Sequence, residues 1–184
     1  MAATKTASGV TELARTIRAV TRRGLAPAAT AELVRAALEA QLGRDDLLAP
    51  EHTEGDPECY RSHILHVEPD GSFSTVALVW LPGQVTPVHD HVSWCVVGVY
   101  RGDEEEIRYR MESSAGAPCL VPTGRSANRQ GTTSCLTPPG DIHLVRNASA
   151  GKVISIHVYG ADIGRLGSSI RRRYDLPIQG TASS

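Results

Sequence analysis

The spacing of apolar residues changes near residue 50 of this 184-residue chain. Over residues 1–50, apolar side chains recur every three or four positions, as in an amphipathic helix, and Leu13, Ile17 and Val20 form one such stripe. Over residues 60–160 the period is two, as in "STVALVW" and "VISIHVY", and turns containing Gly and Pro separate the alternating stretches. Many short strands with no helices between them predict a mainly β antiparallel sandwich or barrel, with two N-terminal helices packed on it.

The chain is long enough for one domain with a sizeable core. We expect residues 1–184 to form this single domain, with a helical part over 1–50 and a β-barrel over 60–160. Residues 161–184 are expected to be a C-terminal tail, in which "RRRYDLPIQGTASS" forms a last helical turn followed by a loose end.

Charge and cysteine content narrow the class of protein. The 19 basic and 20 acidic residues nearly cancel, so there is no electrostatic reason to expect nucleic acid or a membrane surface as a partner. The sequence has no apolar run long enough to cross a bilayer, and its N-terminus lacks the apolar segment of a secretory signal. The four cysteines form no C-x-x-C pair. We therefore expect a cytoplasmic protein with reduced thiols, as a monomer or small homo-oligomer.

The stretch "PVHDHVSWCVVGVYRG" contains two histidines two positions apart, His89 and His91. On one strand without a bulge, alternate residues share a face, so these imidazoles and Cys95 are predicted to point together. Neutral histidine is a good ligand for Fe, Zn, Ni or Cu. His143, in "PPGDIHLVRN", is the candidate third ligand. Three histidines leave two chemistries open, namely water activated by zinc, or iron that binds a substrate and O2.

A second polar pattern lies on "VISIHVYG", where Ser155, His157 and Tyr159 alternate with aliphatic residues. On an edge strand such a polar face would meet water. Inside a barrel, the three side chains would need one another's hydrogen bonds. A chain from the serine hydroxyl through the imidazole to the phenol would fix a histidine tautomer and orient the Tyr159 hydroxyl at the metal.

The glycines and histidines follow two spaced motifs. In the first motif Gly83, His89, His91, Cys95 and Gly102 are spaced G-x5-H-x-H-x3-C-x6-G, and in the second Pro138, Gly140, His143 and Asn147 are spaced P-x-G-x2-H-x3-N. This spacing resembles the paired motifs of the cupin superfamily, which implies a double-stranded β-helix, or jelly-roll barrel. In that family the place of Cys95 is normally held by glutamate, a fourth metal ligand.

The three histidines and the Ser155, His157, Tyr159 pattern together are similar to the thiol dioxygenase family, which includes cysteine dioxygenase and 3-mercaptopropionate dioxygenase. The resemblance covers about residues 60–159. It implies Fe(II) on the three histidines, a substrate thiolate bound to that iron, and oxidation of the sulfur by O2 to a sulfinate. It also implies that His157 and Tyr159 steer oxygen and substrate.

The resemblance leaves the substrate open. L-cysteine is the leading candidate, since its amine and thiolate suit an iron with open positions, and 3-mercaptopropionate is second. A relative that makes another product from a thiol is a further alternative. A cupin that only binds a metal or small ligand is the alternative of another class, although simple binding has no use for a hydrogen-bonded Ser-His-Tyr chain.

Cys95 has an ambiguous role within this family. Animal cysteine dioxygenases join a cysteine near the second metal-binding histidine to the tyrosine by a thioether, and Cys95 is one position closer to that histidine. Strand parity favours a link between Cys95 and Tyr159. Bacterial relatives often have Trp-Gly where this chain has Trp94 and Cys95, which favours no link.

The substrate carboxylate calls for an arginine, whose guanidinium binds carboxylates with two hydrogen bonds. Arg61 is the first candidate, because it lies near the position that cysteine dioxygenases use. Arg165 is the second, in the region that mercaptopropionate enzymes use. In the run 171–173 we expect at least two of the three arginines to be solvated.

Overall fold

The computed structural model describes residues 8–114 and 116–180. In these residues the elements follow the order α1 (Ser8–Thr21), α2 (Pro27–Glu39), η1 (Pro50–Thr53), β1 (Arg61–Val67), β2 (Ser74–Trp80), β3 (His89–His91), β4 (Cys95–Arg101), β5 (Glu104–Ser114), β6 (Ala117–Asn128), β7 (Thr133–Leu136), β8 (His143–Arg146), β9 (Val153–Tyr159), α3 (Ile163–Leu166) and β10 (Ile170–Arg173). None of the helices in the described ranges is long and apolar enough to cross a membrane.

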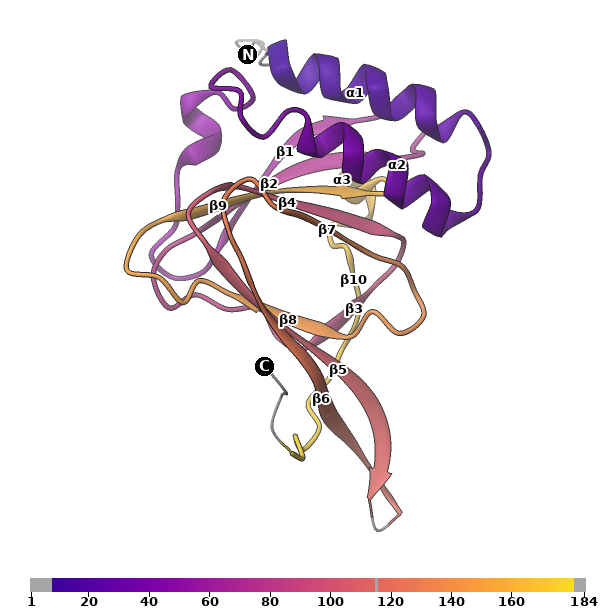
Figure 1. Ribbon diagram of the computed structural model, residues 1–184, viewed down its shortest axis with the longest axis vertical. Helices are drawn as coiled ribbons and strands as arrows, with labels where there is room; N and C mark the ends of the chain where they lie inside the picture. Colours follow the sequence, from indigo (N-terminus) through magenta and orange to yellow (C-terminus); the bar gives the residue numbers. More distant parts are fainter. Residues whose placement is uncertain (1–7, 115, 181–184) are drawn as a thin grey trace.

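The strands form two antiparallel sheets that face each other as a barrel (Figure 1). One sheet has the order β1-β2-β9-β4-β7, and the other has the order β10-β3-β8-β5-β6. The chain crosses repeatedly from one sheet to the other, for example from β3 to β4 and from β8 to β9. This is the cupin double-stranded β-helix, and it confirms the predicted mainly β fold with N-terminal helices.

Helices α1 and α2 cover the outer face of the first sheet (Figure 1). Leu13 and Ile17 of α1 pack in one apolar cluster with Ile154 and Ile156, which point outward from β9. Helix α2 also approaches β4 closely, because a Cβ at Gly98 would lie 2.8 Å from the Leu38 side chain. Since aliphatic residues fill the outer face of β9, the alternate residues of this strand face the barrel interior.

The condition for His89, His91 and Cys95 to share a face, a strand without interruption, is not met. The histidines lie on β3 in one sheet, and Cys95 begins β4 in the other. A bend at residues 92–94 carries the chain between the sheets, so strand parity does not extend across it. Cys95 is nevertheless fully buried and belongs to the apolar cluster inside the barrel.

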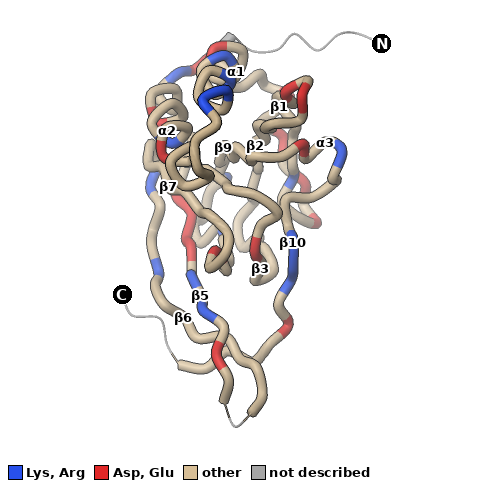
Figure 2. Tube along the Cα trace, turned by 90° about the vertical axis from the view of Figure 1, so that its right-hand side faces the viewer, with Lys and Arg blue, Asp and Glu red and all other residues tan. Residues whose placement is uncertain are grey.

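The expectation of a loose C-terminal tail is also wrong for the described residues up to 180. β10 pairs with β3 and forms the edge of the second sheet, with Arg173 opposite His89. Figure 2 shows the basic residues of β10 beside an acidic residue of β3. Asp90, 1% exposed, accepts hydrogen bonds from Arg171 (2.6 Å), Arg172 (2.7 Å) and the Tyr174 hydroxyl (2.9 Å). This long-range partner is invisible to local sequence patterns.

Candidate metal centre

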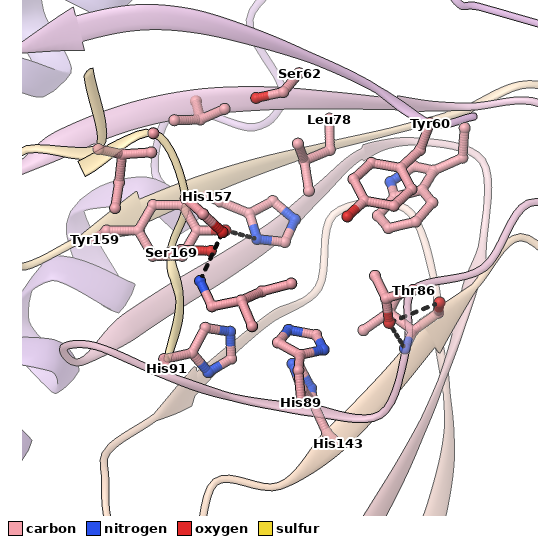
Figure 3. Close-up of a pocket in the computed structure, with 17 residues that line it drawn as sticks. Tyr60, Ser62, Leu78, Thr86, His89, His91, His143, His157, Tyr159 and Ser169 are labelled. Atoms are coloured by element: carbon pink, nitrogen blue, oxygen red, sulfur yellow. Dashed lines mark hydrogen bonds between the residues drawn. The ribbon is translucent and has the colours of Figure 1, made fainter. Parts of the chain in front are cut away.

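A cavity of about 140 Å³ lies inside the barrel (Figure 3). Its walls combine imidazoles, hydroxyls and apolar side chains from both sheets and from the segment before β10. The lining residues are Tyr60, Ser62, Val76, Leu78, Trp80, Thr86, His89, His91, His143, Val145, His157, Tyr159, Ile163, Gly167, Ser168, Ser169 and Ile170. This volume suits a small molecule, because pockets for drug-sized ligands start at roughly 300 Å³.

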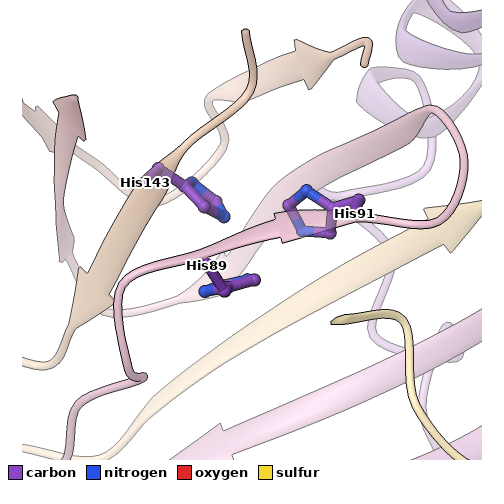
Figure 4. Close-up of side chains that lie close together, drawn as sticks. All are labelled: His89, His91 and His143. Carbon is purple, nitrogen blue, oxygen red and sulfur yellow. The ribbon is translucent and has the colours of Figure 1, made fainter. Parts of the chain in front are cut away.

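Three imidazoles converge at one side of this cavity (Figure 4). His89 and His91 are the two ends of β3, and His143 begins β8 directly opposite His89. One ring nitrogen from each lies within 4.8 Å of the others, and all three residues are buried. The structure thus brings together the three histidines that the sequence proposed as ligands.

Hydrogen bonds on Nδ1 leave the Nε2 atoms free. His89 Nδ1 lies 2.9 Å from the Pro87 carbonyl, His91 Nδ1 lies 3.0 Å from Asp141 Oδ2, and His143 Nδ1 lies 2.8 Å from Glu106 Oε1. Because each acceptor requires a proton on Nδ1, each Nε2 presents a lone pair, as a metal ligand must. His143 Nε2 is buried with no hydrogen-bond partner in the described residues. The donor set therefore fits a metal ion.

Burial and charge keep these groups in the states that metal binding needs. Burial, together with the neighbouring His143 and His91, lowers the pKa of His89 to about 3, so its ring is neutral at pH 7. Burial alone would raise the pKa of Glu106, but the hydrogen bonds and positive charges of His143 and Arg108 together outweigh burial and bring the pKa to about 2. The pKa of Asp141 is lowered in the same way, since the hydrogen bonds from His91, a backbone hydrogen bond of Asp141 itself and the charge of His91 together outweigh burial.

Sequence reasoning missed Asp141 and Glu106. Asp141 precedes His143 by two positions, and its carboxylate also accepts the His91 backbone N–H at 2.9 Å. Glu106 lies in the acidic run that opens β5, and its inward orientation follows from the β5–β8 pairing with Val145. The position of Asp141, close in sequence to the candidate ligand His143, was the signal that could have identified it as a partner of the rings. No local signal distinguishes Glu106 from its neighbours.

Ser155, His157 and Tyr159 form a buried hydrogen-bonded chain on β9. Ser155 Oγ lies 2.9 Å from His157 Nε2, and the Tyr159 hydroxyl lies 3.2 Å from His157 Nδ1. Trp80 Nε1 donates to Ser155 Oγ at 3.1 Å, which leaves the serine O–H free to donate to the imidazole. When the serine O–H donates to Nε2, Nδ1 carries the proton of the neutral ring and donates to the tyrosine oxygen. Burial, with the three metal-site histidines, lowers the pKa of His157 to about 3.

Cys95 lies beside Tyr159 and is not part of the three-histidine cluster. It pairs directly with Tyr159 across β4 and β9, and the two side chains are close enough to shift each other's pKa. Burial raises the pKa of its thiol well above the usual value, so the thiol stays protonated. Cys95 does not line the cavity or belong to the ligand cluster, so the place of the cupin glutamate supplies no fourth ligand among the described residues.

The two predicted substrate-binding arginines lie outside the cavity lining. Arg61 is 47% exposed and lies 3.5 Å from Glu54. Arg165 is exposed on α3. Their assignment to the carboxylate stays a prediction, which this geometry does not favour. The hydroxyl groups of the lining were not anticipated, because they come from short segments without a regular pattern.

Comparisons with solved structures find several similar proteins, some of them described as cupin or double-stranded β-helix proteins. The chain is similar to TT1209 from Thermus thermophilus, with 21% identity, a TM-score of 0.45, and coverage of 60% of this chain and 91% of that one. A Cupin 2 conserved barrel domain protein from Salinispora arenicola has 22% identity and a TM-score of 0.42, with 61% and 83% covered. An uncharacterised double-stranded β-helix protein from Klebsiella pneumoniae has 16% identity and a TM-score of 0.45, with 65% and 92% covered.

The comparison with family models is more specific. The family described as cysteine dioxygenase type I matches residues 1–166, which include both helices, all three metal-site histidines and the chain on β9. The chain therefore belongs to the cysteine dioxygenase type I family.

Proposed function

We propose that this protein is an iron-dependent thiol dioxygenase that uses O2 to oxidise a small thiol carboxylate, with L-cysteine as the leading substrate, to its sulfinic acid. The observation that carries the proposal is the convergence of three free imidazole nitrogens in a small buried cavity, within a chain of this family. The hydrogen-bonded Ser155, His157 and Tyr159 chain at the same cavity supports chemistry beyond simple binding.

His89, His91 and His143 would hold Fe(II). Their Nε2 atoms are neutral donors without a carboxylate among them, a set that leaves positions for substrate and oxygen. Iron(II) bound there would supply the redox chemistry by which O2 oxidises the substrate sulfur. The carboxylates of Asp141 and Glu106 orient two of the rings and raise their basicity.

Tyr159 would act on the substrate through its hydroxyl. His157 Nδ1 lies 3.2 Å from the phenol oxygen and holds the hydroxyl at the cavity lining, where its O–H would donate to a bound ligand when Nδ1 carries the imidazole proton. Ser155 and Trp80 fix the imidazole that does this, and burial keeps the ring neutral. Apolar walls such as Leu78, Val145 and Ile163 exclude water, which strengthens such a hydrogen bond.

A second substrate, 3-mercaptopropionate, has an observation in its favour. The lining includes no acidic side chain that would pair with the ammonium group of an amino acid. We also propose that the reaction takes place in the reducing cytoplasm, since all four cysteines are free thiols. A ligand-binding cupin without oxygen chemistry remains the competing class.

Oxygen consumption tests this proposal. Iron-loaded protein is supplied with L-cysteine, 3-mercaptopropionate or cysteamine, and the product is identified by mass spectrometry. We expect one O2 consumed per sulfinate formed with at least one thiol carboxylate. Zinc as the bound metal with hydrolytic activity, or no O2 uptake with any thiol, would overturn the proposal.

A further inference from the structure

One buried carboxyl faces the barrel interior without a hydrogen-bond partner. Glu104 begins β5 and shares a strand face with Glu106, whose carboxylate meets His143 in the interior. The residue between them, Glu105, faces outward and pairs with Arg125. Glu104 is 3% exposed, and neither of its carboxyl oxygens has a hydrogen-bond partner in the described residues. Burying an unpaired polar group is costly, so such a group is a candidate for a functional role.

Groups on four strands lie near enough to interact with the Glu104 carboxyl. Ser155 of β9 and Asn128 of β6 favour its charged form, and the negative charge of Glu106 on β5 opposes it. On β4, the charge of Glu104 contributes to the raised pKa of the buried Cys95 thiol. Because none of these groups is a cation, burial dominates and raises the pKa of Glu104 to about 7. The carboxyl can therefore take up or release a proton near neutral pH.

Ser155 connects Glu104 to the hydrogen-bonded chain on β9. Its Oγ accepts from Trp80 Nε1 at 3.1 Å and lies 2.9 Å from His157 Nε2. A hydroxyl has one proton and two lone pairs, so Ser155 has one proton and one lone pair left for its other two neighbours. It must donate to either Glu104 or His157 and accept from the other.

The proton on Glu104 therefore sets the direction of every hydrogen bond in the chain. An ionised Glu104 can only accept, so Ser155 donates to it. His157 Nε2 then donates to Ser155, and the Tyr159 hydroxyl donates to Nδ1. A protonated Glu104 donates to Ser155 and reverses each bond, so that the phenol O–H points into the cavity (Figure 3). The imidazole has one N–H in both arrangements, as the neutral ring requires.

The passage of one proton along the chain converts the first arrangement into the second. A thiol in the cavity gives its proton to the Tyr159 oxygen, and the phenol gives its own proton to His157 Nδ1. Nε2 gives its proton to Ser155, and the serine gives its own to Glu104. Each group between the two ends loses one proton and gains one. The thiol thus becomes a thiolate, the carboxylate becomes neutral, and the total charge of the buried site is unchanged.

We propose that Glu104 is the final acceptor of the substrate's thiol proton, which reaches it through Tyr159, His157 and Ser155. This inference rests on the proposed function for the identity of the ligand, since a thiol binds a metal as its thiolate. Glu104 does not line the cavity and acts only through Ser155. Oxidation of a thiol by O2 to a sulfinate releases one proton overall. Glu104 returns that proton to solvent beside its exposed neighbour Asp103.

Proton release on ligand binding tests Glu104 without turnover. Anaerobic iron-loaded protein is titrated calorimetrically with L-cysteine and with 3-mercaptopropionate, in buffers of different ionisation enthalpy, to count the protons released per thiol bound. With a pKa of about 7, Glu104 is ionised at pH 8 and protonated at pH 6. We expect Glu104→Gln to release about 0.9 protons more than wild type at pH 8, and about 0.1 more at pH 6.

Two variants accompany this titration. Ser155→Ala interrupts the path and should release as many protons as Glu104→Gln. Glu105→Gln, on the opposite face of β5, is the matched control and should release as many as wild type. Wild type alone gives a second measurement, because the 3-mercaptopropionate thiol is protonated at both pH values. Its own proton release should rise by about 0.8 from pH 8 to pH 6.

Equal proton release by wild type and Glu104→Gln at pH 8 would overturn the inference. So would an effect of Glu104→Gln that Ser155→Ala does not share, or failure of both thiols to bind wild type. If the proton counts agree with the inference but no thiol supports O2 uptake, the dioxygenase proposal fails and the proton path stands. Sulfinate formation with equal proton release has the opposite meaning.

Discussion

The hydroxyl of Tyr159 is the polar group that the hydrogen-bonded chain on β9 delivers to the cavity. Its oxygen lies 3.2 Å from His157 Nδ1, and its ring centroid lies 6.2 Å from that of His91. A phenol held this way is fixed in position and retains a proton to donate. Burial raises its pKa well above the usual value, so it acts as a neutral donor.

Tyr159→Phe removes that hydroxyl and leaves the ring. We expect iron content to be unchanged and thiol-dependent turnover to fall by roughly ten- to a thousandfold, the range for loss of a hydrogen-bonding or acid–base group. Tyr100→Phe is the control, because its hydroxyl bonds the Arg44 carbonyl at 3.2 Å outside the barrel interior. Wild-type turnover in Tyr159→Phe would mean that the tyrosine only fills space.

A second side-chain prediction concerns the carboxyl of Glu104. It is 3% exposed, and neither oxygen has a hydrogen bond of normal geometry in the described residues. Ser155 and Asn128 lie near enough to favour its charged form in part, but burial dominates, and the charge of Glu106 adds to it. The pKa is raised from 4.5 to about 7.

The sign of the resulting pH dependence follows from linkage. Between these two values the unfolded carboxyl loses its proton while the folded one keeps it, so rising pH destabilises the native state. Glu104→Gln removes the carboxyl and with it this pH-dependent destabilisation. The stability of the variant relative to wild type should therefore increase by about 2 to 3 kcal/mol from pH 5 to pH 8. Urea denaturation of the metal-free proteins at each pH measures this difference in the free energy of unfolding, and exposed Glu58→Gln is the control. A difference between Glu104→Gln and wild type that does not change with pH would contradict the prediction.

Among the secondary-structure elements, the pairing of β4 with β9 brings Cys95 beside Tyr159. Both side chains face the interior, and each shifts the pKa of the other. Joining the sulfur to the ring carbon next to the hydroxyl removes one hydrogen from the thiol and one from the ring, and O2 can accept both.

We therefore expect a Cys95–Tyr159 thioether after prolonged turnover with thiol and Fe(II). Mass spectrometry should find a fraction lighter by two hydrogen atoms, with the two peptides linked, and Cys95→Ser should abolish it. An unchanged mass after turnover, together with an unchanged rate in Cys95→Gly, would show that the thiol is a packing residue.

The contact of β10 with β3 makes another element-level prediction. Asp90 holds Arg171, Arg172 and Tyr174, so it fixes the strand that carries Arg173. Asp90→Asn keeps the shape and removes the charge. We expect a loss of about 1.5 to 3 kcal/mol in the free energy of unfolding. Exposed Asp175→Asn is the control, and equal stability of the two variants would show that β10 is held in other ways.

Alternation and spacing predicted the barrel, the helices, the three histidines and the chain on β9, because each of these is a local pattern. Asp141 and Glu106 were missed as partners of the rings, because their contacts depend on how distant strands pair. The continuous strand to Cys95 failed because alternation does not reveal where a chain changes sheet. β10 was missed because a run of arginines resembles a solvated surface until its buried partner Asp90 is known.

In the molecule as a whole, the outer face of the barrel wall packs against the helices and the inner face lines the cavity. Helices α1 and α2 bury the outer face of the first sheet in an apolar cluster. The inner faces of both sheets are then free to carry polar side chains around one cavity. The site consequently draws on β3, β8, β9 and the segment before β10, and it forms only when the barrel closes.

The most direct test of this account compares iron binding and thiol-dependent O2 uptake in wild type, His89→Ala, His91→Ala and His143→Ala. His66→Ala, outside the cavity lining, is the control. Wild type and the control should each bind one iron per chain and form one sulfinate per O2 consumed. Each of the three site variants should lose both iron and O2 uptake while keeping its fold by circular dichroism. Full iron content with full O2 uptake in any of the three would contradict the assignment of that histidine and the three-histidine centre.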